Sequence, residues 1–185
     1  MKIVKNYLND HDINVLVDLS HAVHKHPDMK SRFRSSYGGW DHSIIQYSPP
    51  VLIWDIPGDF LEQNGVDLLK YDELKNADRF MLYFWPPGSY IPWHNDDHTK
   101  GSGTIYLNKT WNRDWGGFLC WDRGNNEYDM IVPEYNTMAL NNYSENSLKK
   151  FHSVTPVTKP LYFINDNGEV VSEMRSTLQF FCTNQ

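Results

Sequence analysis

From Arg79 to the C-terminus, the chain is a series of short β-type segments separated by turn signals, and no other feature constrains the fold more. The turn signals are Pro-Pro-Gly at 86–88, Gly-Ser-Gly at 101–103, Gly-Asn-Asn at 124–126 and Asn-Asp-Asn-Gly at 165–168. Many short strands with turns between them are typical of a sandwich or barrel. The expected strands are 80–85, 90–94, 103–107, 117–121, 128–132, 137–140, 151–154, 161–164, 170–173 and 176–182.

Residues 1–78 have a different pattern. Residues 10–26 predict an amphipathic helix that Pro27 ends, and a second helix is expected over 60–77, although Gly65 weakens it. Two β-type runs, 44–47 and 51–54, lie between the helices. The apolar stripe of the first helix is Ile13, Leu16, Val17, Ser20 and Val23, and its candidate caps are Asn9, Asp10 and Asp12.

Helices first and strands afterwards favour a mostly β fold with flanking helices. We expect a double-stranded β-helix, or jelly roll, over 79–185, with the N-terminal helices packed on one of its sheets. Residues 1–78 would support this core and carry a substrate lid. At 185 residues, the whole chain is predicted to be one domain.

Composition excludes several classes of function. No apolar run is long enough to span a membrane, and residues 1–6 lack the apolar centre of a signal peptide. The chain has only two cysteines, Cys120 and Cys182, without a secretory context, so we expect reduced thiols and a cytoplasmic location. The formal net charge of −6 argues against binding to a nucleic-acid backbone.

The strand 90–94 ends in a His-x-Asp pair. Side chains two residues apart in a strand share a face, so His94 and Asp96 can take adjacent positions on one metal ion. His152 is the only histidine after His98, and it would complete a set of two histidines and one carboxylate, which is typical of non-haem Fe(II) oxygenases. Zinc is the competing metal. The rival ligands are Asp97, which would face the opposite side, and His98, which follows the end of the strand.

Several motifs, in a fixed order, resemble the prolyl 4-hydroxylase branch of the 2-oxoglutarate- and Fe(II)-dependent dioxygenases, which includes the oxygen-sensing prolyl hydroxylases. The resemblance extends from about 80 to 181. The motifs are Pro87-Gly88, His94-Asn95-Asp96, Tyr106-Leu107-Asn108, Trp115-Gly116-Gly117, Val132-Pro133, His152-Ser153-Val154-Thr155-Pro156 and Arg175-Ser176-Thr177-Leu178-Gln179.

The resemblance implies that His94, Asp96 and His152 bind Fe(II). It also implies that Arg175 holds the distal carboxylate of 2-oxoglutarate, because a guanidinium meets a carboxylate with two parallel hydrogen bonds. Tyr106 occupies the place where the family has a phenol against that carboxylate. Gln179 is in phase with Arg175 and would line the same pocket. The implied cosubstrates are 2-oxoglutarate and O2, with ascorbate as a candidate reductant.

The sequence departs from the family at the carboxylate anchor. In the family the basic residue follows the second histidine closely, whereas here the stretch 153–174 lies between His152 and Arg175. Asp166-Asn167-Gly168 is a hairpin signal, so we interpret residues 159–174 as an inserted hairpin that restores the register at Arg175. Lys159, beside Pro160, is the rival anchor, because some members of the family use a lysine.

The resemblance is closest to enzymes that hydroxylate prolyl residues in polypeptides, which predicts a peptide or protein substrate. The loop 31–42, with Arg32, Arg34, Tyr37 and Trp40, could close over an extended peptide. Three alternatives remain. The chain could hydroxylate a free amino acid or other small molecule, demethylate a nucleic-acid base by oxidation, or be a non-catalytic metal-binding jelly roll.

Overall fold

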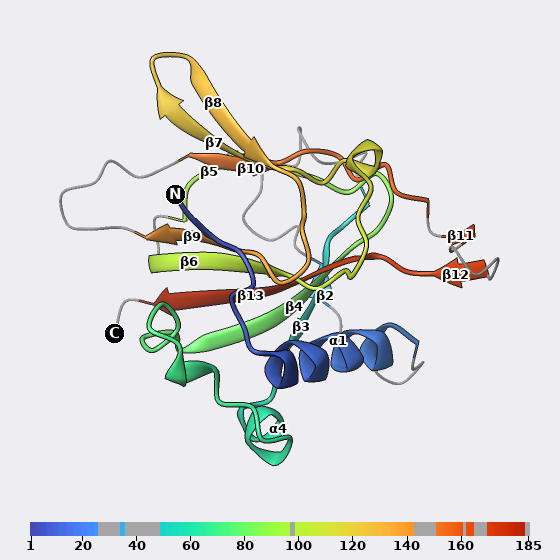
Figure 1. Cartoon of the computed structure of the whole chain (residues 1–185). Coiled ribbons are helices and arrows are strands. Elements are labelled where there is room, and N and C mark those ends of the chain that lie inside the picture. The colour runs from blue at the N-terminus through green and yellow to red at the C-terminus, as the bar shows by residue number, and fades with distance from the viewer. Residues whose placement is uncertain are drawn as a thin grey trace.

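The computed structural model describes residues 1–25, 34–35, 49–96, 99–142, 151–160, 162–164 and 170–183. These residues form two facing antiparallel sheets and a separate hairpin, the jelly roll that the strand series predicts (Figure 1). The large sheet has the order β1 (Lys2–Val4), β9 (Met138–Asn142), β6 (Thr99–Tyr106), β13 (Arg175–Thr183), β4 (Arg79–Trp85), β3 (Leu52–Asp55) and β2 (Arg34–Ser35). The small sheet has the order β5 (Ile91–His94), β10 (His152–Val154), β7 (Leu119–Gly124) and β8 (Glu127–Ile131).

The longest strand, β13, lies in the middle of the large sheet between β4 and β6. In this register Arg175 lies opposite Trp85, and Thr177 lies between Tyr83 and Tyr106. Because side chains alternate along a strand, Arg175, Thr177 and their partners face the small sheet, and the next residue of each strand faces away from it. The C-terminal strand thus brings residues distant in sequence to one inner surface.

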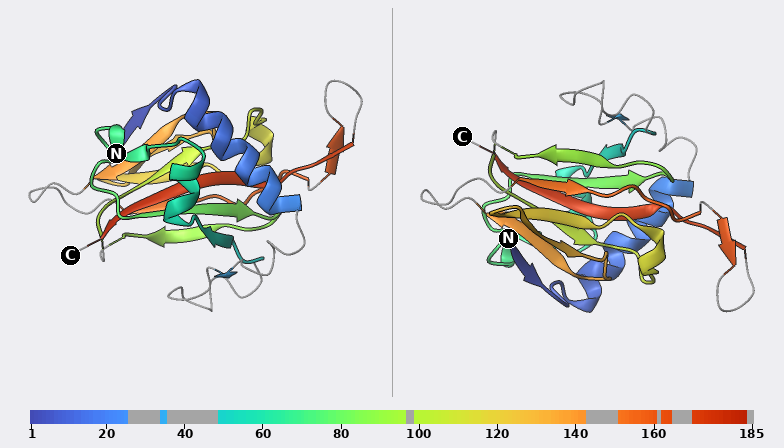
Figure 2. Two further views of the ribbon diagram at one scale, coloured as in Figure 1. Left: turned by 90° about the horizontal axis from the view of Figure 1, so that it is seen from below. Right: turned by 90° about the horizontal axis from the view of Figure 1, so that it is seen from above.

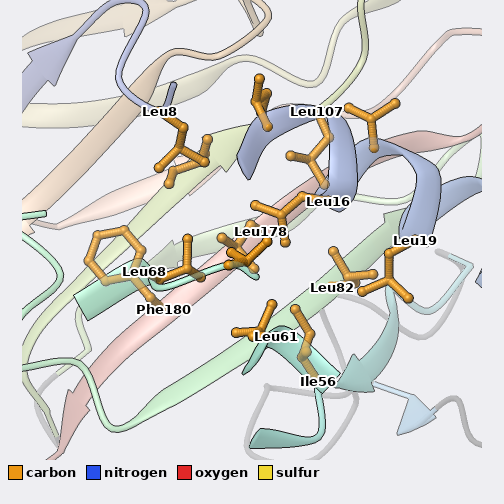
Figure 3. Packing of buried hydrophobic residues seen from close by; sticks show 14 of the residues in the cluster. Leu8, Leu16, Leu19, Ile56, Leu61, Leu68, Leu82, Leu107, Leu178 and Phe180 are labelled. Atoms are coloured by element: carbon orange, nitrogen blue, oxygen red, sulfur yellow. The ribbon is translucent and has the colours of Figure 1, made fainter. Parts of the chain in front are cut away.

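The outer face of the large sheet is covered by helix α1 (Asp10–Lys25) and the short helix α4 (Gly58–Gln63), which lie on the side opposite the small sheet (Figures 1 and 2). Asn9 is the capping residue of α1, because its Oδ1 accepts a hydrogen bond of 2.9 Å from the backbone N–H of Asp12. Leucines and other apolar side chains fill the layer between helix and sheet (Figure 3). This layer includes Leu16, Leu82, Leu107, Leu178 and Phe180.

A second, smaller apolar cluster lies between the two sheets. It contains two tryptophans, Trp85 from the large sheet and Trp121 from the small sheet, together with Leu119 and Val154. These residues hold the sheets apart around the cavity described below. The N-terminal strand β1, which pairs with β9, closes one edge of the large sheet and was not predicted from the sequence.

Two expectations for the chain proved wrong. The second helix does not continue to Ala77, because α4 ends at Gln63 and Gly65 adopts a φ of +67°; a 3-10 helix at Leu68–Lys70 follows. The Gly-Ser-Gly at 101–103 is not a turn but lies inside β6, paired on both sides with β13 and β9. The predicted run 44–47 and most of the loop 31–42 lie outside the described residues, except for Arg34 and Ser35 in β2.

The inserted hairpin that the sequence predicts before Arg175 is present as β11 (Tyr162–Ile164) and β12 (Val170–Ser172), which pair in antiparallel fashion. It projects from the end of the two sheets (Figure 1). Among the described residues, no helix has the length and apolar character needed to cross a membrane.

Candidate active site

Three predicted ligand side chains meet where the small sheet faces the large one. His94 and His152 are cross-strand partners in the antiparallel pair of β5 and β10, and their ring centroids are 4.1 Å apart. Oδ1 of Asp96 lies 3.6 Å from Nε2 of His94, and Oδ2 of Asp96 lies 3.6 Å from Nε2 of His152. One ligand atom from each residue lies within 4.8 Å of the others, so this group could hold an iron ion. The rivals Asp97 and His98 lie outside the described residues.

The protonation state of His94 suits a metal ligand. Burial, reinforced by the nearby His152, lowers the pKa of His94 to about 4 against the opposing effect of Asp96, so the imidazole is neutral at pH 7. Its Nδ1 lies 2.8 Å from the carbonyl oxygen of Pro92. Because a carbonyl can only accept, Nδ1 carries the proton and Nε2 presents its lone pair towards Asp96 and His152.

A cavity extends from this triad between the two sheets. The space between its lining side chains, with the solvent at its open mouth included, is about 510 Å³. Its wall combines aromatic and aliphatic side chains with a nearly equal number of polar or charged ones. The lining residues are Tyr83, Trp85, Ile91, His94, Asp96, Thr104, Tyr106, Leu119, His152, Val154, Arg175, Gln179 and Phe181.

Arg175 is the one lysine or arginine in this lining, and only 1% of its surface is exposed. Its guanidinium carbon lies 4.4 Å from the ring centroid of Trp85 and 5.4 Å from that of Tyr106. Nε and Nη1 of Arg175 and the hydroxyl of Tyr106 make no hydrogen bond with the described residues. Buried donors without acceptors are unfavourable, so these atoms fit an anionic ligand such as a carboxylate.

Burial sets the protonation of both groups. It lowers the pKa of Arg175 to about 10, against the stabilising effect of Tyr106, so the guanidinium keeps its charge at neutral pH. Burial raises the pKa of Tyr106 to about 12, although the positive charge of Arg175 opposes this shift. The phenol therefore stays protonated and can donate a hydrogen bond to an anion.

Gly117 explains part of the Trp-Gly-Gly motif. It adopts a φ of +67°, and a Cβ at this position would lie 2.8 Å from Cδ and 3.0 Å from Nε of Arg175. A side chain here would therefore push the guanidinium out of place, and the backbone conformation itself favours glycine.

The two candidate anchors lie in different surroundings. Lys159 does not line the cavity: its Nζ donates to the carbonyl oxygen of Glu173 at 2.6 Å and lies 3.6 Å from the Glu173 carboxylate. It also lies 5.0 Å from the ring centroid of Trp115. The hairpin insertion thus brings Arg175, and not Lys159, to the cavity.

The family model described as the 2OG-Fe(II) oxygenase superfamily matches residues 79–167. This segment of the chain is therefore similar in sequence to that superfamily. Its members use Fe(II), 2-oxoglutarate and O2. The match covers all three candidate metal ligands and ends before Arg175, so the assignment of Arg175 depends on the geometry of the cavity.

Solved structures of similar fold include prolyl hydroxylases. A prolyl-4-hydroxylase from Pseudomonas putida has a TM-score of 0.62 at 14% identity, with 100% of this chain and 92% of that chain covered. A prolyl hydroxylase from Trichoplax adhaerens, in complex with a hypoxia inducible factor peptide fragment, has a TM-score of 0.62 at 16% identity, with 97% and 82% covered. No curated protein matches the chain in sequence.

Three residues of the candidate site were not predicted. The ring of Trp85 contacts Arg175. The hydroxyl of Ser102 donates a hydrogen bond to Asp96, and the amide of Asn141 contacts Nδ1 of His152. Their places depend on which strands pair across the large sheet, and strand pairing leaves no local signal in the sequence. Gln179 lines the cavity as expected, and its Oε1 accepts a hydrogen bond of 2.7 Å from Thr104.

Proposed function

We propose that this protein is an Fe(II)- and 2-oxoglutarate-dependent oxygenase that hydroxylates prolyl residues within a peptide or protein, with release of succinate and CO2 from 2-oxoglutarate. The observation that carries the proposal is the presence of two complementary groups in one cavity. The triad of His94, Asp96 and His152 could hold Fe(II), and the buried Arg175 presents N–H donors that no described residue accepts.

Each residue has a proposed role. His94, Asp96 and His152 hold Fe(II), which when bound supplies the redox chemistry that couples O2 and 2-oxoglutarate to hydroxylation. Arg175 binds the distal carboxylate of 2-oxoglutarate, and Tyr106 donates a further hydrogen bond to it.

Trp85 and Gln179 complete the proposed cosubstrate cavity. Trp85 stacks on the guanidinium of Arg175 and limits its rotation. Gln179 lies four residues along β13, roughly 13 Å from Arg175, so it contacts a different part of the bound molecules. The aromatic and aliphatic side chains of the wall exclude water from the reacting atoms.

The similar structures support the choice of a peptidyl substrate. The relatives from Pseudomonas putida and Trichoplax adhaerens are prolyl hydroxylases, and the second was solved with a peptide. A free amino acid or other small molecule is the alternative that the same cavity could serve. We also propose a cytoplasmic location, which the two free cysteines, Cys120 and Cys182, support.

A substrate screen tests the proposal. Purified protein would be incubated with Fe(II), 2-oxoglutarate, ascorbate and either a library of proline-containing peptides or free amino acids, and succinate would be measured. We expect peptides to stimulate succinate release, with a mass gain of one oxygen located on proline by fragmentation. The His152→Ala variant is the control. Stimulation by free proline or another small molecule, without stimulation by any peptide, would refute the peptidyl substrate.

A further inference from the structure

We propose that Ser102 and Asn141, two facing residues of the large sheet, are positioning residues that orient Asp96 and His152 for metal binding. The inference depends on the metal site proposed above. The two histidines of the site belong to the small sheet, and the large sheet would supply the side chains that orient Asp96 and His152.

The two residues form one cross-strand pair. Ser102 in β6 and Asn141 in β9 are direct partners in the antiparallel register, and their exposed fractions are 4% and 3%. Ser102 also lies opposite Phe181 of β13, another residue that lines the cavity. The pair is therefore held rigidly by backbone hydrogen bonds on a surface that faces the ligands, as an orienting group must be.

Ser102 fixes the Asp96 carboxylate. Its Oγ donates a hydrogen bond of 2.5 Å to Oδ2 of Asp96. Asp96 lies two residues after His94, the last residue of β5, so no strand pairing fixes the direction of its side chain. Thr99 binds the Asp96 backbone carbonyl through its N–H and its hydroxyl, at 2.9 and 3.0 Å, so these bonds hold the backbone of Asp96, whereas the Ser102 hydroxyl holds its carboxylate.

Asn141 is the side-chain partner of Nδ1 of His152. The amide nitrogen of Asn141 lies 3.3 Å from Nδ1 of His152. In this arrangement the amide donates to Nδ1, and a neutral His152 carries its proton on Nε2, which faces Asp96 Oδ2 at 3.6 Å. Metal binding through Nε2 needs the opposite tautomer, in which Nδ1–H donates to Oδ1 of Asn141 after a half-turn of the amide. An asparagine at this position can therefore form a hydrogen bond with Nδ1 in either tautomer of His152.

Nδ1 of His94 has a backbone partner instead. It faces the backbone carbonyl of Pro92, an acceptor that no substitution of a side chain removes. The three ligands are thus supported unequally. The tautomer of His94 is set by its own strand, whereas Asp96 and His152 depend on two side chains of the opposite sheet. This difference makes the inference testable by substitution at Ser102 and Asn141.

The experiment measures metal binding directly. Co²⁺ would be titrated into Ser102→Ala, Asn141→Leu and wild-type protein without 2-oxoglutarate, and the dissociation constant and visible absorption spectrum recorded. Loss of a group that orients a ligand typically weakens metal affinity about 10–100-fold, and we expect that range for each variant. Ser176→Ala is the matched control, because Ser176 is a buried serine on the outer face of the same sheet. It should bind Co²⁺ as the wild type does.

Conservative variants separate orientation from a general loss of structure. Asn141→Asp keeps an acceptor for Nδ1–H of His152, and Ser102→Thr keeps the hydroxyl. Both variants should therefore retain most of the affinity for Co²⁺. The thermal unfolding of all variants would also be recorded without metal. Wild-type affinity and spectrum in Ser102→Ala and Asn141→Leu would overturn the inference, as would equal weakening by the conservative pair. If the wild type binds no Co²⁺, both the metal site and this inference fail. If it binds Co²⁺ but hydroxylates no peptide, only the proposed substrate fails.

Discussion

The two faces of β13 differ completely in character, although they alternate along one strand. Leu178 and Phe180 point outward, are fully buried and lie in the apolar layer on the outer face of the large sheet. Arg175 and Gln179 point inward to the cavity, and Arg175 is buried with hydrogen-bond donors that no described residue accepts. The outer face stabilises the fold, whereas the inner face retains polar groups that a ligand must satisfy.

This division implies that stability and activity can be changed separately. Apolar packing of the outer face is tight: a Cβ at Gly103 would lie 2.3 Å from Cζ of Phe180. The inner face contains polar groups whose burial opposes folding unless a partner is bound. Substitutions on the outer face should therefore reduce the free energy of unfolding, and substitutions on the inner face should reduce ligand binding.

The largest expected effect follows from removing a proposed metal ligand. His94→Ala or His152→Ala should abolish conversion of 2-oxoglutarate to succinate, because two remaining ligands hold the metal weakly. The melting temperature without metal should change little in comparison. The exposed His11 on α1 provides the matched control, and His11→Ala should keep its activity. Wild-type turnover by the double variant lacking both histidines would exclude this triad as the metal site.

The outer face should give the opposite result. Phe180→Ala removes a fully buried ring and should lower the free energy of unfolding by about 3–5 kcal/mol. Molecules that remain folded should keep the wild-type KM for 2-oxoglutarate, because Phe180 does not line the cavity. Denaturant titration and steady-state kinetics at low temperature measure the two quantities. A large rise in KM with little loss of stability would mean that the faces are not independent.

Arg175→Met sharpens the comparison from the inner side. The substitution removes a buried charge but keeps an apolar chain beside Trp85, so the ligand-free protein should be as stable as the wild type or more stable. The loss of a charge-assisted pair should raise the KM for 2-oxoglutarate roughly 10–100-fold, since hydrogen bonds to charged groups contribute about 1.5–3 kcal/mol.

Lys159→Met is the control for this prediction. Lys159 is as deeply buried as Arg175, with 1% of its surface exposed, but it contacts Glu173 outside the cavity. Its substitution should lower stability and leave the KM for 2-oxoglutarate nearly unchanged. The reverse ranking of the two KM values would identify Lys159 as the carboxylate anchor. Thermal shift with and without 2-oxoglutarate gives an independent measure of the same difference.

The sequence predicted much of this division, because alternation along a strand is a local property. The series of short strands, the helix α1 and the inserted hairpin before Arg175 were all confirmed. The prediction of a second helix over 60–77 was wrong beyond Gln63, because Gly65 adopts a positive φ just after the end of α4. The helix propensity of the following residues alone was not enough to form a helix there. The glycines at 101–103 indicated a turn, but the neighbouring strands keep them extended in β6.

The composition of the site was less predictable than its position. His94 and Asp96 could be named from the sequence because they are two residues apart on one continuous segment, although β5 ends at His94 and Asp96 lies just beyond it. Ser102, Asn141 and Trp85 reach the site only because β6, β9 and β4 are neighbours of β13 or of one another in the large sheet. Non-local pairing of this kind is decided by the whole fold, so a single sequence without the structure gives no means of naming these residues.

Tyr106→Phe gives the smallest expected effect and tests a single atom of the inner face. The hydroxyl of Tyr106 is buried without a hydrogen bond to the described residues, and burial raises the pKa of the phenol to about 12. Removing it should leave the ligand-free protein equally stable or slightly more stable, because an unsatisfied buried hydroxyl is unfavourable. The same change should weaken 2-oxoglutarate binding by about 2–10-fold, the range that one hydrogen bond of roughly 0.5–1.5 kcal/mol allows. Calorimetric titration with 2-oxoglutarate would measure the change in affinity. Unaltered affinity together with a loss of stability would mean that the hydroxyl supports the fold and that Arg175 holds the carboxylate without it.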